Sequence, residues 1–573
     1  MVKKPFESRI QDLVYNVDSG IGVTIIKLLL YILFVGVVIV VYTANQYKGL
    51  RDAEAMEYAQ LGRNISLEAP WLITKNVRPL SIWYVTNASE DLSAQLGRHP
   101  DLIHAPLYPA LLAASFIGID FDRMPAGPHE VYAPETRIML LNHFFSVLVG
   151  IMVLLLGRRL FDHRIALIGM SLFFLSDMVW RDSLSGTGIP VATFFAVTAI
   201  YAMVIAVGRL DESDTSWNWV LPVVFSALLC GLAFLTRFAA VVLVPGLLVY
   251  LAWAMRGRCW MGILTFLGVF MIPASVWMGR NLFLGFGPLG LLPYLILQGS
   301  GDFPGNALER SLELNVGIGT VLSAIPDRLQ REFRTFYEGS MLTLGNGILI
   351  AIFITTYFYR FVRFPVHALR WGLALSFVLL MVVGALFGES AFGFASMFWP
   401  FVILYGLAFF MLLLERLQLR WVFLNRTVIG VLFLLVGLPM IFTLMPPRAR
   451  ITYPPYSPRL IHFVSNMLEP TEMICTDMSW ATAWYGNRVS VLLPYSVEQF
   501  YDIHDYMHRF SGLYFTLITR DQPFISVLQS SAYETWMPIM EGRIPGDFPL
   551  PRAIPLLPPD QIFFSDRARW EER

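Results

Sequence analysis

The sequence predicts an all-α polytopic membrane protein with about eleven transmembrane helices and a small extracytoplasmic α/β domain at the C-terminal end. Three observations lead to this fold class: the composition, the long apolar segments and the arginines between them. Of the 573 residues, 56% are apolar and 15% are charged, whereas soluble domains average about 45–50% apolar and about 25% charged residues. The net charge of zero gives no electrostatic support for a nucleic-acid partner.

A helix that crosses a bilayer needs about 20 mostly apolar residues. The segments that meet this requirement are 22–42, 137–157, 165–181, 189–207, 219–235, 237–255, 261–280, 341–360, 371–388, 395–414 and 422–444. The first apolar segment is too long for a signal peptide and lacks a clean small-residue cleavage site, so we expect an uncleaved anchor.

Lysine and arginine residues occupy the amino terminus and alternate short links between the segments. They are Lys3, Lys4, Arg9, Arg158, Arg159, Arg164, Arg256, Arg258, Arg360, Arg363 and Arg370. Because positive charges are enriched on the cytoplasmic side of membrane proteins, we expect a cytoplasmic amino terminus. The loops 43–136 and 281–340 and the tail 445–573 then face outward.

This topology separates the three cysteines. Cys230 lies in a predicted span, Cys259 in a cytoplasmic turn and Cys475 in the outer tail. Because no two of them are expected to meet, the sequence argues against a disulfide framework and against a cysteine-based zinc site.

The outer parts of the chain carry structure of their own. We expect a transmembrane module over 1–445 and an extracytoplasmic α/β domain over 446–573. In the first outer loop, 52–65 has helical character, and 107–119 predicts a helix at the outer surface because it is too short to span. The tail predicts strands and helices, with strands over 473–476, 489–493 and 510–519 and helices over 479–486 and 497–509.

Four charged residues follow the first span directly: Arg51, Asp52, Glu54 and Glu57. A carboxylate near a low-dielectric surface can have its pKa raised, which suits a general base that deprotonates an acceptor. The Asp52–Glu54 pair is alternatively a ligand set for a hard divalent cation. The plainer interpretation is the solvated face of an amphipathic helix.

Two arginines lie at the outer ends of spans, against the general distribution of positive charge. Arg237 lies between the fifth and sixth segments, and Arg280 ends the seventh. A guanidinium group there is able to bind a lipid phosphate through two parallel hydrogen bonds, although such a side chain equally often extends to lipid headgroups. His104 and Arg78 in the first outer loop are weaker candidates for the same role.

The link between the third and fourth segments carries Asp177, Arg181 and Asp182. One interpretation is that these side chains orient an acceptor or a sugar, with Asp182 as a substrate-binding candidate. The other is that they form an internal salt bridge worth under about 1 kcal/mol. The sequence contains no P-loop, no dinucleotide-binding fingerprint, no zinc-protease motif and no nucleophile elbow.

The stretch EAMEYAQLGRNI matches a family pattern in register at Tyr58, Leu61, Arg63, Asn64 and Ile65. It resembles the opening of the first outer loop in the GT-C class of membrane glycosyltransferases, which includes lipid A aminoarabinose transferase and the protein O-mannosyltransferases. The resemblance implies that Glu54 is the catalytic carboxylate. Asp52 is the alternative if the register shifts.

Further stretches follow in the order that is usual for this class, and the resemblance covers residues 22 to 300. They are His104–Pro109, GRRLFDHRIALIG, SLSGTGIP, GLAFLTRF and GRNLFLGFGP. Three departures concern donor-sugar recognition. Glutamate replaces aspartate at the catalytic place, and small residues replace an acid in SLSGTGIP, which leaves Asp182 as a substitute. Gly393 and Phe394 stand where an arginine–tyrosine pair is common.

The resemblance implies an inverting transferase that moves a sugar from a polyprenyl-phosphate donor to an extracytoplasmic glycan, lipid or protein. The donor phosphate is then held by Arg237, Arg280 and His104. Because phosphate is a good leaving group, no cofactor is expected, and a metal ion at Asp52 and Glu54 is dispensable. The implied location is a bacterial inner membrane.

Two alternatives stay open. A lipid-sugar flippase or secondary transporter predicts charges at the bilayer midplane and inverted repeats, neither of which the sequence shows. A non-catalytic scaffold subunit of envelope polysaccharide assembly is compatible with the departures from the family pattern. The sequence does not identify the donor sugar or the acceptor.

Overall fold

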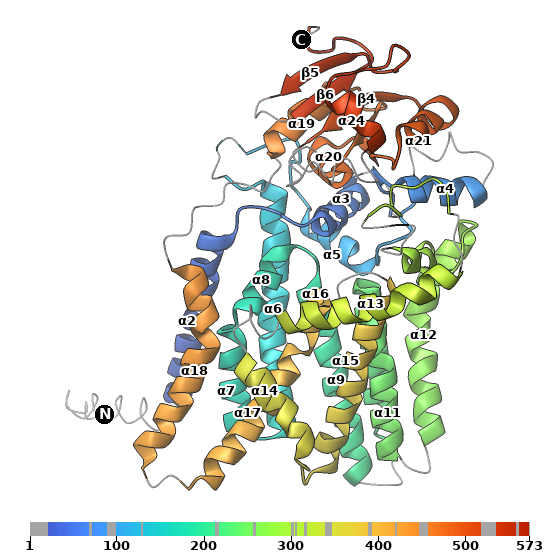
Figure 1. The fold of residues 1–573 in the computed structure, drawn as a ribbon. Helices are drawn as coiled ribbons and strands as arrows, with labels where there is room; N and C mark the ends of the chain where they lie inside the picture. The colour runs from blue at the N-terminus through green and yellow to red at the C-terminus, as the bar shows by residue number, and fades with distance from the viewer. Residues whose placement is uncertain are drawn as a thin grey trace, which may run out of the picture.

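The computed structural model describes residues 21–67, 72–88, 99–125, 127, 130–212, 217–255, 259–298, 303, 306–314, 318–338, 347–387, 392–418, 421–445, 457–516, 534–556 and 561–571. A bundle of long helices forms the larger part of the molecule, and a domain that contains a β-sheet caps one end of it (Figure 1). Short helices lie between these two parts, so the fold has three layers along the bundle.

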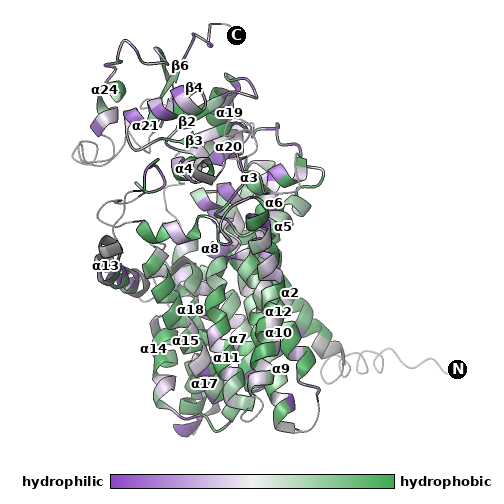
Figure 2. Ribbon diagram, turned by 90° about the vertical axis from the view of Figure 1, so that its right-hand side faces the viewer, coloured by the Kyte–Doolittle hydropathy of each residue, from purple (hydrophilic) through white to green (hydrophobic). Residues whose placement is uncertain are grey.

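The bundle consists of helices that follow the predicted apolar segments. In chain order they are α2 (Ile21–Gln46), α6 (Ala133–Leu160), α7 (His163–Phe174), α8 (Asp177–Ser185), α9 (Ile189–Glu212), α10 (Val220–Thr236), η2 (Phe238–Val242), α11 (Leu243–Met255), α12 (Cys259–Phe283), α14 (Gly347–Thr355), η6 (Thr356–Phe358), α15 (Phe364–Phe387), α16 (Phe392–Ala395), η7 (Ser396–Phe398), α17 (Trp399–Arg416) and α18 (Val422–Leu444). Hydrophobic residues dominate the bundle, and hydrophilic residues gather in the layers above it (Figure 2). An apolar exterior of this extent is stable only where water is absent.

Within the described parts of the chain, eight helices are long and apolar enough to cross a membrane, or nine if the bent pair α7 and α8 counts as one span. Two shorter apolar helices, Val220–Thr236 and Gly347–Phe358, accompany them. Each predicted apolar segment contains a helix, so the polytopic all-α membrane fold is confirmed. The count of eleven spans and the orientation in the membrane stay predictions.

The segment predicted as a span over 165–181 is divided into two helices. α7 ends at Phe174, α8 begins at Asp177, and the two helices are bent by 55°. Side chains satisfy the backbone around the break: the Trp180 indole donates to the Phe174 carbonyl over 2.8 Å, and the Ser176 hydroxyl donates to a carbonyl in α7. Internal hydrogen bonds of this kind stabilise a break in a region without water.

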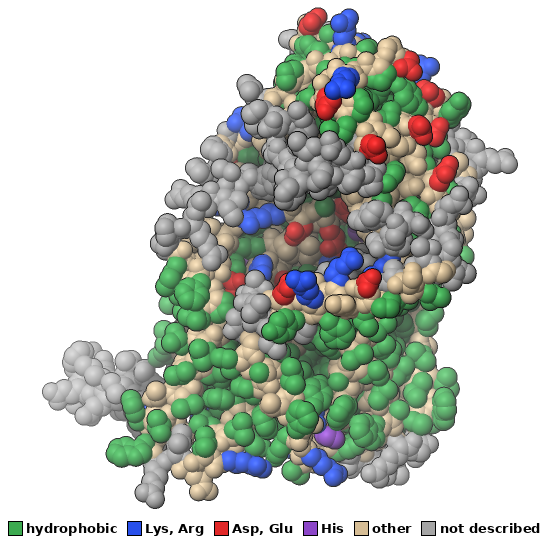
Figure 3. Space-filling model, viewed as in Figure 1, with side chains coloured by type: hydrophobic (Ala, Val, Ile, Leu, Met, Phe, Trp, Pro, Cys, Tyr) green, Lys and Arg blue, Asp and Glu red, His purple; other side chains and the backbone are tan. Residues whose placement is uncertain are grey.

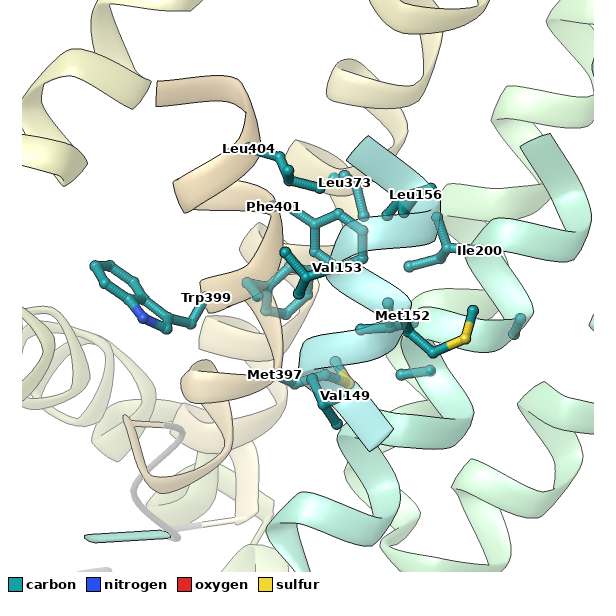
Figure 4. Packing of buried hydrophobic residues seen from close by; sticks show 14 of the residues in the cluster. Val149, Met152, Val153, Leu156, Ile200, Leu373, Met397, Trp399, Phe401 and Leu404 are labelled. Carbon is teal, nitrogen blue, oxygen red and sulfur yellow. The ribbon is translucent and has the colours of Figure 1, made fainter. Parts of the chain in front are cut away.

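The centre of the bundle is an apolar core contributed by α6, α9, α15 and α17. Side chains from these helices point toward one another in Figure 4, among them Val149, Val153, Leu156, Ile200, Leu373 and Phe401. A glycine allows three helices to approach closely, because a Cβ at Gly157 of α6 would lie 2.9 Å from both Ala166 of α7 and Leu404 of α17. Such close packing is the main source of helix association in lipid, where the hydrophobic effect between helices is lost.

The middle layer consists of α3 (Ala53–Leu67), α4 (Pro79–Ala88) and α5 (Leu107–Ser115), with η4 (Leu292–Leu297) and α13 (Ile318–Tyr337) beside it. The helices predicted over 52–65 and 107–119 are confirmed, although α5 already ends at Ser115. Residues 55–64 of α3 are buried in spite of their polar composition. The burial has a simple cause, since α5 packs on one side of α3 and α20 (Ser479–Gly486) packs on another.

The capping domain contains a six-stranded sheet of order β1-β3-β2-β4-β6-β5. Its strands are β1 (Asn76–Val77), β2 (Met473–Thr476), β3 (Val489–Leu492), β4 (Phe510–Phe515), β5 (Arg552–Leu556) and β6 (Gln561–Ser565). β1, β3, β2 and β4 run parallel, and β6 pairs antiparallel with both β4 and β5. The strands predicted in the tail are confirmed, but 517–519 lie outside the described residues. β1 comes from the segment between α2 and α6, which the sheet thereby joins to the tail.

Buried polar contacts fix the capping domain on α3 and α6. Its helices are α19 (Pro458–Asn466), α20, α21 (Val497–Asp502), the π-helical turn η8 (Ile503–Met507), η9 (Glu534–Trp536) and α24 (Met537–Met540). Arg63 of α3 donates to the carbonyls of Ala483 and Trp484 over 2.8 and 2.6 Å. Glu135 at the start of α6 accepts from the Trp484 indole and the Tyr485 hydroxyl over 3.2 and 2.6 Å. The capping domain therefore holds the helix that carries the predicted catalytic acids.

Candidate active site

The acidic residues predicted at the outer surface lie at the start of α3, directly after a short connection from α2. Glu135 holds this connection, because its carboxylate accepts from the Leu50 amide over 3.3 Å and its backbone carbonyl accepts from the Tyr47 hydroxyl over 2.7 Å. The Met56 amide bonds to the Asp52 carbonyl and continues the first turn. The position of the acidic residues is therefore fixed from α6 as well as from α3.

The end of α8 approaches the start of α3 closely. Gly186 closes α8 with a φ of 79°, in the left-handed region that favours glycine. A Cβ at this position would lie 2.6 Å from Leu50 and 3.0 Å from Ala55. A larger residue would push the two helices apart, which gives a physical reason for glycine at position 186.

Glu54 and Arg237 form an ion pair above the bundle. The Glu54 carboxylate lies 3.0 Å from the Arg237 guanidinium, which follows the last turn of α10. Arg237 also donates to the Thr187 carbonyl over 3.1 Å and lies over the Phe394 ring. The Glu54 side chain is 39% exposed and that of Arg237 is 15% exposed. Acidic and basic side chains line a hollow at this level of the molecule (Figure 3).

A second group of charged residues, the Glu57 cluster, lies further along α3 and consists of Glu57, Arg78, Asp101, His104 and Glu309. One Glu57 oxygen accepts from Arg78 over 2.7 Å, and the other lies 2.8 Å from His104 Nε2. The opposite ring nitrogen of His104 lies 2.8 Å from the Asp101 carboxylate. Arg78 also approaches Glu309 to 3.5 Å. His104 and Arg78, both predicted to contact substrate, thus contact carboxylates of the protein.

The members of the Glu57 cluster hold one another in their charged forms. Burial favours the neutral ring, but the Asp101 and Glu57 carboxylates outweigh it and raise the pKa of His104 to about 10. Burial also opposes ionisation of Glu57, yet Arg78 and His104 lower the pKa of Glu57 to about 2. A carboxylate with such a low proton affinity is a poor general base, so Glu57 is suited to positioning α3.

His104 predicts a characteristic dependence of stability on pH. Its pKa is about 10 in the folded protein and about 6.5 in an unfolded chain. The His104 contribution is therefore complete below about pH 6.5 and is lost as the pH rises through about 10. At pH 7, His104→Leu should lower the free energy of unfolding by about 3–5 kcal/mol, because two buried carboxylates lose their partner. Thermal unfolding in nanodiscs measures the effect.

The matched control for this prediction is His163→Leu, which alters an exposed histidine at the start of α7. This variant should unfold like the wild type across the same pH range. The difference between wild type and His104→Leu should shrink from pH 7 to pH 10. A difference that stays constant over this range would contradict a charged His104.

Arg280, in the last turn of α12, contacts the segment that carries the Glu57 cluster. Its guanidinium donates to the Asp101 carbonyl over 2.7 Å and to the Asn281 side chain over 3.0 Å, and it lies over the Trp277 ring. A third contact reaches the Leu72 carbonyl at 3.4 Å. Arg280 therefore holds the backbone next to His104, whereas Arg237 contacts a carboxylate directly.

A cavity of about 650 Å³, the Asp52 cavity, opens between α2, α8 and α18 and is lined by Asp52, Asp177 and Arg181. Asp177 lies 3.2 Å from Arg181 and accepts from the Tyr42 hydroxyl over 2.9 Å. Loss of hydration and the neighbouring Glu54 carboxylate raise the pKa of Asp52. Asp182 lines a different, small cavity with Ser396 and Trp399. The acidic group predicted at 177–182 is therefore divided between two sides of α8.

Across the described ranges, no group of three or more His, Cys, Asp or Glu side chains is placed to hold a metal ion. A divalent cation at Asp52 and Glu54 stays a prediction. Cys230, Cys259 and Cys475 are free thiols.

Three residues of the site were not predicted from the sequence: Asp101, Glu309 and Glu135. Asp101 had a local signal, because it precedes His104 by three residues and a short turn brings the two side chains together. Glu309 and Glu135 reach the site from distant parts of the chain. Nothing in their immediate sequence distinguishes them from acids at the protein surface.

Comparisons with known proteins agree with this geometry. Residues 132–278 match the family model described as dolichyl-phosphate-mannose-protein mannosyltransferase. The structure of ArnT from Cupriavidus metallidurans bound to undecaprenyl phosphate is similar to this chain, with a TM-score of 0.53 and 11% identity over 94% of this chain and 98% of that chain. The chain has the GT-C fold.

Two structures of the oligosaccharyltransferase AglB from Archaeoglobus fulgidus share the GT-C fold with this chain. The complex with an inhibitory peptide and a dolichol-phosphate has a TM-score of 0.53 and 11% identity, covering 84% of this chain and 68% of that chain. The complex with Zn and sulfate has a TM-score of 0.53 and 12% identity, covering 87% and 70%. Among curated proteins, none matches the sequence. The resemblance predicted from the sequence is confirmed, and both findings support the glycosyltransferase class that it implied.

Proposed function

We propose that the chain transfers a sugar from a polyprenyl-phosphate donor to a hydroxyl acceptor on the outer side of a bacterial inner membrane. The Glu54–Arg237 pair carries the proposal, because it sets a carboxylate beside a guanidinium group at the outer end of the bundle. The family match supports a transferase. The complexes of ArnT with undecaprenyl phosphate and of AglB with a dolichol-phosphate support the donor class.

Arg237 neutralises Glu54 in the resting protein. A donor phosphate competes for the guanidinium group, since phosphate matches its fork of donors as well as a carboxylate does. Binding of the donor then releases Glu54 from its ion pair. The free carboxylate accepts a proton from the acceptor hydroxyl, which is the role of a general base.

The reaction is a single displacement. The acceptor oxygen forms a bond to the anomeric carbon while the bond from that carbon to the phosphate oxygen breaks. The hydroxyl proton passes to Glu54, and the electron pair leaves with the polyprenyl phosphate, whose developing charge Arg237 stabilises. Attack from the side opposite the leaving group inverts the configuration. Arg280 and the Glu57 cluster position the segment around His104 and the helix α3.

The distribution of positive charge supports the proposed orientation. Arg158 and Arg159 in the last turn of α6 and Arg416 in the last turn of α17 belong to the end of the bundle farthest from the capping domain, where Figure 3 shows lysine and arginine side chains in addition to those around the hollow and on the capping domain. Positive charge is enriched on the cytoplasmic side of membrane proteins. The capping domain and the Glu54–Arg237 pair then face the outer side, where a lipid-linked donor presents its sugar.

Deletion of the gene in its host tests the proposed function. The polyprenyl-phosphate sugar should accumulate and one envelope glycan should disappear, because the step that joins them is lost. Mass spectrometry of extracted lipids and envelope glycans measures both changes. The wild-type gene should reverse them. Restoration by a Glu54→Gln, Asp52→Asn double variant would instead identify a scaffold, since a scaffold needs neither carboxylate.

A further inference from the structure

The Asp52 cavity has a polar end and an apolar wall. The polar end contains two carboxylates, two guanidinium groups and a hydroxyl, and Leu438 and Phe442 of α18 contribute to the apolar wall; the polar residues are Asp52, Asp177, Arg51, Arg181 and Ser185. Its volume of about 650 Å³ lies within the range of sites that enclose a small molecule, about 300–1,000 Å³. A ligand that fills this space needs hydrogen-bonding groups at one end and hydrocarbon at the other.

The apolar wall belongs to helices at the edge of the bundle. α2 and α18 run side by side there (Figure 1). Phe442, which lines the cavity, is 53% exposed, so the cavity is open to the surroundings of the bundle at this point. Leu434, about two turns earlier on α18, is 56% exposed and does not line the cavity. α2 ends at Gln46 and α18 at Leu444, both next to the cavity. A lipid in the outer leaflet therefore reaches the cavity from the side.

The polar end of the cavity is connected to the Glu54–Arg237 pair. The Ser185 hydroxyl lies 2.8 Å from the Thr187 hydroxyl. The Thr187 carbonyl accepts from Arg237 over 3.1 Å, and Arg237 contacts Glu54. The cavity and the ion pair thus share the short segment 185–187, so a hydroxyl group held in the cavity is close to the proposed base.

A separate cavity of about 230 Å³ lies on the other side of α8, where Met178 and Ser396 meet mostly apolar side chains of α14, α15 and α17. Its lining includes Ala395, which follows in the chain directly after Phe394, the residue whose ring lies under Arg237. An apolar space whose lining adjoins, along the chain, a residue in contact with the proposed phosphate-binding group suits the hydrocarbon chain of the donor. The Asp52 cavity, which is polar at one end, is then available to the second substrate.

We propose that the Asp52 cavity binds the acceptor, and that the acceptor is a membrane-anchored amphiphile with a hydroxylated headgroup. This inference rests on the proposed function and names its acceptor class. The headgroup hydroxyls donate to Asp52 and Asp177, while the hydrocarbon part lies along Leu438 and Phe442. A soluble polysaccharide or a polar peptide has no hydrocarbon to cover this wall.

Photolabelling of the wild-type protein in nanodiscs tests the inference. The probe is dodecyl β-glucoside with a diazirine in its alkyl chain, and mass spectrometry locates the labelled peptides. Label should concentrate on α2, α8 and α18. Unlabelled dodecyl β-glucoside should compete, whereas methyl β-glucoside, which lacks the tail, and dodecyldimethylamine oxide, which lacks the hydroxyls, should not.

Leu438→Trp fills the cavity from α18 and should lower the labelling at least about tenfold. Leu434→Trp places the same side chain outside the cavity on the same helix and should label within about twofold of the wild type. If Leu438→Trp fails to insert into the membrane, Phe442→Trp takes its place as the cavity-filling variant, because Phe442 also lines the cavity. The inference would be overturned if the cavity-filling and control variants were labelled equally, or if the label were spread over all helices at the surface of the bundle. Labelling needs no sugar transfer, so failure of the proposed reaction leaves the result interpretable.

Discussion

Replacing Glu54 by Gln should lower the rate of sugar transfer by about 10²- to 10⁴-fold, the usual contribution of a general base. Gln keeps the size of the side chain and can still accept from Arg237, but it cannot take the acceptor proton. Because Glu54 is 39% exposed, the substitution should not disturb insertion or folding. The measurement is the single-turnover rate of polyprenyl phosphate release in nanodiscs saturated with donor.

A matched control exists in the capping domain, where Glu541 and Arg543 form an ion pair with the same separation of 3.0 Å. Glu541→Gln should transfer sugar at the wild-type rate.

Asp52→Asn distinguishes the two registers of the family pattern, because Asp52 lines the Asp52 cavity. It should raise the acceptor requirement and leave the rate at saturation nearly unchanged. Wild-type rates in both single variants and in the double variant would reject this loop as the catalytic loop.

The transmembrane fold was predictable because lipid imposes a simple rule on sequence. Every spanning helix needs a continuous apolar segment, so the segments could be found without any knowledge of their partners. The break between Phe174 and Asp177 was not predictable in this way. It depends on hydrogen bonds from Trp180 and Ser176 to nearby groups, and apolar content alone does not distinguish a broken helix from a straight one.

The candidate site was predictable in its residue types but not in its pairing. Glu54 and Arg237 were both named from the sequence, yet they are far apart in the chain, and only the fold brings them to 3.0 Å. His104 and Arg78 were predicted to contact substrate, which stays a prediction, and the fold brings both of them to Glu57. The sequence alone does not distinguish a cationic loop residue that binds an anionic ligand from one that pairs with a buried carboxylate of the protein.

The capping domain shows why buried charge is difficult to predict. Arg63 was identified only as part of a family pattern, but its guanidinium donates to two carbonyls of α20. Glu135 receives three donors from two separate parts of the chain. Such networks stabilise one arrangement of the layers because an unpaired charge at the same place would be strongly unfavourable. The tertiary structure determines which groups meet in such networks, and the local sequence does not indicate these pairings.

Replacing Arg237 by Leu should raise the donor concentration needed for half-maximal transfer by at least about tenfold. A lost hydrogen bond to a charged group costs about 1.5–3 kcal/mol, and each 1.4 kcal/mol corresponds to about a factor of ten. Arg237→Lys should restore only part of the affinity, because an ammonium group lacks the planar fork that binds phosphate at two points. Titration of the donor in nanodiscs measures the requirement.

Arg280→Leu provides a comparison within the same site, and Arg543→Leu controls for the loss of an exposed ion pair. Arg280 donates to the Asp101 and Leu72 carbonyls, so its loss should lower thermal stability and the rate at saturation more than it alters the donor requirement. Arg237 contacts the proposed base, so its loss should act mainly on the donor requirement. An unchanged donor requirement in Arg237→Leu would assign this guanidinium to the lipid headgroups. Equal increases in both variants would mean that Arg280 also holds the phosphate, in which case its contacts with the backbone must open when the donor binds.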